Sequence, residues 1–196
     1  MKIAVIPARG GSKRIPRKNV KLFCGKPIMS WTIQAAIDSD LFDYVIVSTD
    51  DEEIATIAKS LGAKVPFLRS EELSTDETPT RAVVINAINE AIKHYGRPDY
   101  VCCAYATAVF LTPETLQQGF KTLLDKDADF AFSVTSFSSP IQRALKILPS
   151  GRLKMFNPEH RISRSQNLEL AYHDAGQFYW GRTEAFLDDL PTFSKH

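Results

Sequence analysis

The chain has 196 residues, a formal net charge of +1 and 44% hydrophobic residues. This length and composition predict one domain with a substantial core, and they exclude a disordered or tail-like chain. Because positive and negative charges nearly balance, the molecule as a whole lacks the field that would attract nucleic acid or a membrane, so a cationic cluster is a local feature.

The cysteines and the apolar runs bear on the compartment. Cys24, Cys102 and Cys103 are odd in number, and two of them are adjacent in an apolar run. This pattern suits neither a disulfide framework nor a metal cluster. No charged and apolar leader opens the sequence, and no run approaches the ~18 apolar residues of a membrane span. We therefore expect a soluble, cytoplasmic protein.

A cationic loop with paired glycines follows the first apolar run, residues 3–6. Gly10 and Gly11 can adopt positive φ and allow backbone N–H groups to approach an anion, and Ser12 adds a donor. The cations of this stretch are Arg9, Lys13, Arg14, Arg17, Lys18 and Lys21, with no Asp or Glu among them. Because their fields add, the loop is predicted to bind a triphosphate.

Two other interpretations of this charge run are a solvated face and a nucleic-acid patch. Its position favours a binding site, because it lies at the carboxyl end of the first predicted strand, where open α/β sheets bind their ligands. The loop is not a P-loop, because the G-x-x-x-x-G-K-[ST] spacing is missing. An RNA-binding role would require interleaved aromatic residues, which the loop lacks.

Predicted helices and strands then alternate. A helix follows Pro27, and residues 44–48 form an apolar, β-branched strand. Asp50 and Glu53 form a capping-box-like start to a second helix, which Gly62 ends. The apolar stripes of these two helices are Ile28, Trp31, Thr32, Ala35 and Ile37 in the first, and Ile54, Ile57, Ala58 and Leu61 in the second.

The alternation continues to about residue 134. A short strand at 64–67 and a polar loop at 70–78 lead to a helix that Pro79 opens. A strand at 100–105, a helix from Thr112 and a strand at 129–134 follow. Repeated strand–helix units imply an α/β fold of three layers, with a mostly parallel, twisted sheet and helices on both of its faces.

The pattern changes after residue 138. Residues 140–155 contain a Pro-Ser-Gly turn between two apolar stretches and are predicted to form a hairpin. Residues 157–170 are polar and irregular. A strand at 177–180 and a last helix near 184–187 complete the chain. We find no internal repeat and no interdomain linker.

The loop, the hairpin and the segment 172–180 (YHDAGQFYW) together resemble the cytidylyltransferases that activate nine-carbon acidic sugars, the acylneuraminate cytidylyltransferase or CMP-sialic acid synthetase family. The matching motifs are Ala8-Arg9, Ser12-Lys13, Lys18-Asn19, Val47-Ser48-Thr49-Asp50 and the loop from Asp76 to Thr80. The resemblance implies a single nucleotidyltransferase domain over 1–196, Rossmann-like and of the nucleotide-diphospho-sugar transferase type. Its parts are a nucleotide-binding half at 1–136, a hairpin and irregular insertion at 137–171, and a return strand and helix at 172–196.

Two segments differ from the relatives that use sialic acid. Near position 105 those relatives have a glutamine and a Pro-Thr-Ser-Pro-like turn, whereas this chain has Tyr-Ala-Thr-Ala-Val at 105–109. The His-Asp-Ala-Gly-Gln stretch at 173–177 likewise replaces an Asn-Gly type of segment. The resemblance therefore implies pseudaminic acid as the sugar, in glycan biosynthesis such as flagellin glycosylation, with sialic acid as the alternative.

The activity implied by the resemblance converts CTP and the sugar acid into the CMP-sugar and pyrophosphate, with Arg9, Lys13 and Lys18 as catalytic cations. The implied nucleotide-binding residues are Arg9, Gly10, Gly11, Ser12, Lys13, Lys18, Asn19, Thr78 and Thr80.

The implied sugar-binding residues are Tyr105, Thr107, Arg143, Arg164, His173, Asp174, Gln177 and Tyr179. Arg143 and Arg164 are the candidates for the sugar carboxylate, because a guanidinium binds it bidentately. The alternatives are a core role for Tyr179 and a solvated charge at Arg143.

The expected cofactor is Mg²⁺. Family members hold it with an Asp-x-Asp pair on a strand beyond position 196, so we expect the metal carboxylates to lie outside the sequence given, with Asp174 as a weak candidate within it. We therefore expect these 196 residues to bind CTP better than they turn it over, and a CTP-binding module without turnover stays an alternative.

The expected partner is a second copy, joined through an arm at 140–170. We expect no nucleic-acid or membrane partner.

Overall fold

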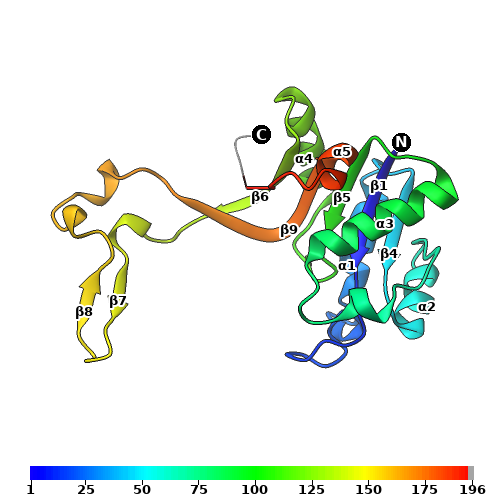
Figure 1. The fold of residues 1–196 in the computed structure, drawn as a ribbon, viewed down its shortest axis with the longest axis horizontal. Helices are drawn as coiled ribbons and strands as arrows, with labels where there is room; N and C mark the ends of the chain where they lie inside the picture. The colour runs from blue at the N-terminus through cyan, green and yellow to red at the C-terminus, as the bar shows by residue number, and fades with distance from the viewer. Residues whose placement is uncertain (194–196) are drawn as a thin grey trace. The chain divides into compact units, whose positions relative to one another are not determined.

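The computed structural model describes residues 1–193 (Figure 1). The chain divides into two compact units: Met1–Ser133 with the segment from Gly176 onward, and Val134–Ala175. The last three residues of the return segment predicted at 172–196 lie outside the described residues. None of the helices within residues 1–193 combines the length and the hydrophobicity that a membrane span requires.

A five-stranded sheet has the strand order β4-β1-β5-β9-β6. Its strands are β1 (Lys2–Pro7), β4 (Tyr44–Ser48), β5 (Tyr100–Ala104), β6 (Phe130–Ser136) and β9 (Tyr172–Arg182). β1 pairs in parallel with both β4 and β5, whereas β9 runs antiparallel to β5. The predicted α/β fold with a mostly parallel sheet is confirmed, and the antiparallel direction of β9 is a feature that the sequence did not predict.

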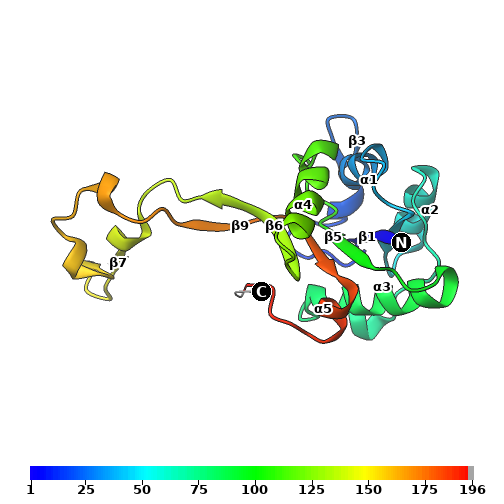
Figure 2. The same cartoon turned by 90° about the horizontal axis from the view of Figure 1, so that it is seen from above.

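Alternate residues of β1 face two separate cores, as the period of two in a strand requires. Ala4 and Ile6 belong to one core, and Ile3 and Val5 belong to the other. The helices are α1 (Met29–Asp38), α2 (Glu52–Ser60), α3 (Thr80–Tyr95), α4 (Pro113–Asp125) and α5 (Thr183–Leu187). Residues of α1, α2 and α4 share the first core, and residues of α3 and α5 share the second. Figure 2 shows α1 and α4 on one side of the sheet and α3 and α5 on the other, so the three layers are confirmed.

The buried face of α1 differs from the predicted stripe. Of the predicted stripe, Thr32 and Ala35 are buried and Ile37 is 38% exposed, while Met29, Ile33 and Ala36 are buried in addition. Trp31 leaves the sheet side and packs against the small hairpin of β2 (Leu22–Phe23) and β3 (Lys26–Pro27), where its Nε1 donates to the Phe23 carbonyl oxygen at 3.1 Å. Trp31 has apolar partners away from the sheet, so periodicity alone identified only part of the core side.

The strand predicted at 64–67 is reduced to one bridge between Lys64 and Ile46. The Lys64 N–H donates to the Val45 carbonyl oxygen at 2.7 Å, and its own carbonyl accepts from the Val47 N–H at 2.9 Å. Pro66 has no N–H with which to extend a ladder. The apolar stretch therefore continues as loop.

The first helix turn after β4 is capped by Asp51, and the prediction of a capping box from Asp50 and Glu53 is wrong. Asp51 Oδ1 accepts from the Ile54 N–H at 3.0 Å. The same carboxylate pairs with the guanidinium of Arg17. Asp50 turns away from the helix, and its Oδ1 accepts from the Gly10 N–H at 2.9 Å. The two adjacent aspartates thus connect the cationic loop to the start of α2.

We expect Asp51→Ala to lower the free energy of unfolding by ~1–2 kcal/mol, because the helix loses its N-cap. Asp51→Asn retains a capping oxygen and loses only the pair with Arg17, so its loss should stay below ~1 kcal/mol. Denaturant unfolding at pH 7 measures both values. Equal stability of Asp51→Ala and the parent chain would contradict the assigned cap.

The contribution of the Arg17 pair should depend on pH. The hydrogen bond from Arg17 lowers the pKa of Asp51 below its ordinary value of 3.8. A carboxyl group with a lowered pKa in the folded state contributes its stability above the ordinary pKa and loses it as the pH falls through the folded-state pKa. The difference in unfolding free energy between the parent chain and Asp51→Asn should therefore be constant at neutral pH and shrink below about pH 3.8.

The second unit contains the predicted hairpin, formed by β7 (Leu145–Ile147) and β8 (Leu153–Met155). Its turn closes through the Leu148 N–H, which donates to the Arg152 carbonyl oxygen at 2.8 Å, and Gly151 has a φ of 76°. The stretch after the hairpin holds only short 3₁₀ turns, Pro158–His160 and Ser165–Asn167. Both the hairpin and the irregular segment are confirmed.

The adjacent cysteines have a structural role. Cys102 and Cys103 are buried in β5 and contribute one to each core. Burial raises the pKa of the Cys103 thiol to about 12. Both side chains therefore act as small apolar groups of the sheet.

Candidate functional site

A pocket of about 400 Å³ lies in the first unit, lined by segments that follow the parallel strands. The cationic loop comes directly after β1 at Pro7, and Tyr105, Ala106 and Thr107 come directly after β5. A third wall consists of residues between Arg69 and Val83. The pocket therefore lies at the carboxyl edge of the parallel strands, the edge at which the sequence placed a binding site.

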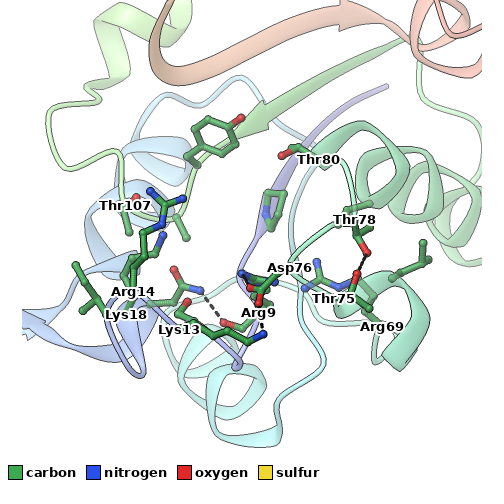
Figure 3. A pocket seen from close by; sticks show the side chains of 18 residues that line it. Arg9, Lys13, Arg14, Lys18, Arg69, Thr75, Asp76, Thr78, Thr80 and Thr107 are labelled. Atoms are coloured by element: carbon green, nitrogen blue, oxygen red, sulfur yellow. Dashed lines mark hydrogen bonds and ion pairs between the residues drawn. The ribbon is translucent and has the colours of Figure 1, made fainter. Parts of the chain in front are cut away.

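Many predicted site residues meet in this pocket, although they come from three distant parts of the sequence. Those that line it are Arg9, Ser12, Lys13, Lys18, Asn19, Thr78, Thr80, Tyr105 and Thr107. Figure 3 shows Arg14 and Lys18 on one side, Thr75 and Thr78 on the opposite side, and Arg9 with Asp76 between them.

The charge of the described pocket wall is strongly positive. Its cations are Arg9, Lys13, Arg14, Lys18 and Arg69, and its one carboxylate is that of Asp76. Arg14 and Arg69 are additions to the predicted set. Such a concentration of cations in a concave site suits a ligand with several negative charges, such as a nucleoside triphosphate with about four.

The conformation of the cationic loop differs from expectation at its two glycines. Neither Gly10 nor Gly11 has a positive φ, whereas Arg17 has one of 54°. The Gly10 N–H donates to Asp50, so it is engaged by a protein carboxylate. Asn19 is almost fully buried, and its Nδ2 donates to the Arg9 carbonyl oxygen at 2.9 Å, which fixes the backbone next to Arg9.

Gly10 is required by close packing. A Cβ at this position would lie 2.5 Å from Asp51 Oδ2, whereas a Cβ at Gly11 would meet nothing within 4 Å. The loop therefore touches the N-terminal end of α2 at Gly10. The two glycines look equivalent in the sequence and have different roles in the structure.

The expectation that the loop cations act together without neutralisation is wrong, because carboxylates approach from other segments. Arg17 pairs with Asp51 and Glu53, and it lies outside the described pocket lining. Asp76 pairs with both Arg9 and Lys13. The cations that carry no ion pair within residues 1–193 and still line the pocket are Arg14 and Lys18.

Arg69 is a pocket residue that sequence reasoning missed. Its side chain is only 3% exposed, Nε donates to Ser74 Oγ at 3.0 Å, and Nη2 lies 3.8 Å from Asp50 Oδ1. Burial lowers the pKa of Arg69, and the nearby Asp50 carboxylate opposes that shift. The available signal was an arginine directly after the apolar stretch 65–68, since a buried guanidinium is uncommon without a specific role.

The loop of the third wall is organised by hydroxyl groups. Thr75 Oγ1 and Thr78 Oγ1 lie 2.8 Å apart, and Thr78 Oγ1 donates to the Glu72 carbonyl oxygen at 3.2 Å. Thr80 begins α3 after Pro79. These hydroxyls give this side of the pocket neutral donors and acceptors opposite the cations.

The sugar-binding candidates of the first unit lie around Tyr105. The Tyr105 N–H donates to the Gln177 carbonyl oxygen at 2.9 Å, and its ring meets the edge of the Tyr179 ring at a centroid distance of 5.7 Å. Tyr179 also stacks on Phe132. Gln177 and Tyr179 thus support a pocket residue, and within the described lining only Tyr105 and Thr107 of the sugar candidates appear.

The other sugar-binding candidates lie in the second unit. Arg143 Nη1 donates to Ser165 Oγ at 3.3 Å, which brings Arg143 beside the residue that follows Arg164. His173 Nδ1 lies 2.9 Å from the Asp174 carbonyl oxygen, and its ring meets that of Phe137. Arg143 therefore lies close to the chain at position 164 within one unit. The sugar-binding roles of Arg143, Arg164, His173 and Asp174 stay predictions.

The described side chains do not fit a magnesium ion held by protein carboxylates alone. No group of three or more His, Cys, Asp or Glu residues within 1–193 is arranged to hold a metal ion. Asp76 is the one carboxylate of the described pocket wall, and both of its oxygens are paired with cations. Asp174 belongs to the second unit.

Comparison with known proteins gives the family. The profile of a family described as Cytidylyltransferase matches residues 3–191. The chain is 45% identical to a pseudaminic acid cytidylyltransferase of Campylobacter jejuni over 194 residues, 99% of this chain and 84% of the relative. It is 29% identical to the N-acylneuraminate cytidylyltransferase of Escherichia coli over 99% of this chain and 45% of that protein.

A solved structure of similar fold is a CMP:2-keto-3-deoxy-manno-octonic acid synthetase complexed with CTP. It superposes with a TM-score of 0.72 over 97% of this chain and 78% of the other, at 18% identity, which supports the fold alone. With the family profile extending over nearly the whole chain, and with close full-length relatives, this chain belongs to the cytidylyltransferase family.

Proposed function

We propose that this chain is a CTP-dependent cytidylyltransferase that activates a nonulosonic acid, with pseudaminic acid as the sugar. The observation that carries the proposal is the convergence of Arg9, Lys13, Arg14, Lys18 and Arg69 on one pocket at the carboxyl edge of the sheet. The choice of sugar rests on the 45% identity to the Campylobacter jejuni pseudaminic acid enzyme over nearly the whole chain. The departures from sialic acid relatives at 105–109 and 173–177 support the same choice.

In the proposed reaction, the anomeric hydroxyl oxygen of the sugar attacks the α-phosphorus of CTP. A bond forms between that oxygen and phosphorus, the bond from the α-phosphorus to the bridging oxygen breaks, and pyrophosphate leaves while the hydroxyl proton is released. Negative charge grows on the leaving group, so preorganised cations lower the barrier. We assign this role to Arg9, Lys13 and Lys18, while Asn19, Thr78 and Thr80 position the nucleotide.

Magnesium belongs to the proposal as a companion of the triphosphate. Bound to phosphate oxygens, the ion would neutralise part of their charge. Among the described lining residues, Asp76 is the one carboxylate that would be available to such an ion. The proposal also places the enzyme in the cytoplasm, where CTP is made.

Pyrophosphate release measured with each nucleoside triphosphate and with pseudaminic, sialic and 3-deoxy-octulosonic acids tests the proposal. We expect turnover with CTP and the highest kcat/KM with pseudaminic acid. A preference for sialic acid would select the alternative substrate. Binding of CTP without pyrophosphate release under any combination would select a nucleotide-binding module instead.

Removing Arg143 or Arg164 is expected to raise the KM for the sugar and to leave CTP binding unchanged. Each guanidinium is assigned to the sugar carboxylate, and the loss of one charge-assisted hydrogen bond costs ~1.5–3 kcal/mol, or about a 10- to 150-fold higher KM. Arg152→Ala, at the exposed hairpin turn, is the matched control and should behave like the parent chain. Loss of CTP affinity with an unchanged sugar KM would disprove this assignment.

The proposal includes a homodimer in which a second copy covers the second unit. This unit leaves many large apolar side chains exposed: Phe137, Ile141, Leu145, Ile147, Leu153, Phe156, Ile162, Leu170 and Tyr172. Exposed apolar surface of this extent is characteristic of an interaction site. Light scattering should give the mass of a dimer, and Ile147→Asp should shift it toward the monomer; a monomeric parent chain would disprove this part.

A further inference from the structure

Asp76 occupies the position of an anion between two of the cations assigned to the triphosphate. Its Oδ1 pairs with Arg9 Nη2, and its Oδ2 lies 2.6 Å from Lys13 Nζ. A carboxylate that bridges an arginine and a lysine uses the donors that phosphate oxygens would use. A triphosphate that takes these same donors would displace the Asp76 carboxylate from them.

Asp76 is held in a way that permits such an exchange. Lys13 is 83% exposed and Asp76 34% exposed, and ion pairs in contact with water are weak. Asp76 is carried by a loop whose neighbours Thr75 and Thr78 are linked to each other by their hydroxyls. The buried Arg69, by contrast, is fixed to Ser74 and lies near Asp50. The exposed ion pairs of Asp76 and the buried contacts of Arg69 thus lie on the same wall of the pocket.

We propose that Asp76 is an internal competitor for the triphosphate subsite and thereby a specificity-determining residue. Its carboxylate holds Arg9 and Lys13 before the nucleotide binds, is displaced by a ligand with several phosphates, and returns as pyrophosphate leaves. This inference rests on the proposed assignment of Arg9 and Lys13 to the triphosphate. Displacement costs free energy only for ligands that pair with these two cations, so it lowers their apparent affinity and leaves that of other ligands unchanged.

The consequence is discrimination by phosphate content. A triphosphate or pyrophosphate offers enough oxygens to replace the Asp76 carboxylate at both cations. Cytidine, which has no phosphate, binds without displacing it. Removing the charge of Asp76 should therefore strengthen binding of CTP and pyrophosphate and leave the binding of cytidine unchanged.

Calorimetric titration of the chain with CTP, pyrophosphate and cytidine tests this inference with two variants. Asp76→Asn keeps the size of the side chain and removes its charge. Glu77→Gln removes the same charge one position along the loop, where the glutamate makes no ion pair with residues 1–193. We expect Asp76→Asn to lower the Kd for CTP and for pyrophosphate by about threefold to tenfold. The Kd of Asp76→Asn for cytidine, and the Kd values of Glu77→Gln for all three ligands, should stay within about twofold of those of the parent chain.

Three results would overturn the inference. Weaker CTP binding by Asp76→Asn would make Asp76 a positioning residue for the cations, and an unchanged Kd of Asp76→Asn for CTP would show that the carboxylate does not compete. Equal strengthening of CTP binding by Glu77→Gln would indicate a general charge effect. Thermal unfolding of both variants confirms that the comparison is made on folded protein.

Pyrophosphate separates the two proposals, because its binding requires no cytidine recognition. Tighter pyrophosphate binding by Asp76→Asn in a chain that rejects CTP would uphold the inference and refute the proposed function, whereas CTP binding without any effect of Asp76→Asn would refute the inference alone.

Discussion

Replacing Arg9 by alanine is expected to lower kcat/KM for CTP by about 10- to 150-fold, the equivalent of ~1.5–3 kcal/mol for one charge-assisted contact. Arg9 lines the pocket, and its backbone is fixed by Asn19, so its guanidinium is held where the triphosphate is proposed to bind. Its removal also deprives Asp76 of one partner and leaves that carboxylate as a more effective repulsive charge. The fold should be unaffected, because the side chain is partly exposed and takes no part in either core.

Arg17→Ala is the matched control for Arg9→Ala. Arg17 lies in the same loop, but its guanidinium pairs with Asp51 and Glu53, outside the described pocket lining. This variant should lose a little stability and keep its CTP kinetics. Steady-state pyrophosphate release with CTP as the varied substrate measures both variants. Normal CTP use by Arg9→Ala, or an equal loss in Arg17→Ala, would show that the phosphates bind elsewhere.

Gly10→Ala is expected to damage both stability and activity. The new Cβ would lie 2.5 Å from Asp51 Oδ2 and 3.0 Å from Asp51 Cβ. Asp51 has little freedom to move, because it caps α2 and pairs with Arg17. We expect the free energy of unfolding to fall by ~1–3 kcal/mol through overpacking. A shift of the loop by about 1 Å would misplace Arg9 and lower kcat/KM for CTP by roughly 10- to 100-fold.

Gly11→Ala supplies the control for this substitution. Gly11 has no atom within 4 Å of an added Cβ, and its φ is not positive, so alanine fits there without strain. Its unfolding free energy and its CTP kinetics should match those of the parent chain. Denaturant unfolding and pyrophosphate release are measured on both variants. Similar behaviour of the two would show that the contact between Gly10 and Asp51 does not shape the site.

The sequence was most informative where one local rule acts without competition. The apolar run 3–6, the β-branched run 44–48 and the Thr-Pro-Glu start at Thr112 each formed the predicted element. The cationic loop was placed at the carboxyl edge of the sheet because it follows a buried strand, and the pocket lies there. These features depend on residues that are neighbours in the chain.

Local rules failed where two partners competed for the same group. Asp50 and Asp51 both suit a helix cap, and the choice of Asp51 goes together with the hydrogen bond from the Gly10 N–H to Asp50. Pro66 ended a strand that hydrophobicity favoured. In α1, Trp31 contacts the β2–β3 hairpin, so the buried stripe coincides with the predicted one only in part.

The fold class, the family and the edge of the sheet where the pocket lies could be predicted from the chain alone, because the succession of strands and helices and the motif at 8–19 are local information. Which charges are available in the pocket follows instead from contacts between distant segments. Asp76 lies more than sixty residues from Arg9 in the chain, yet the two form an ion pair, and Arg69 was found to be a buried member of the same wall. Electrostatic interaction depends on distance in space and on burial, and neither can be read from the order of residues.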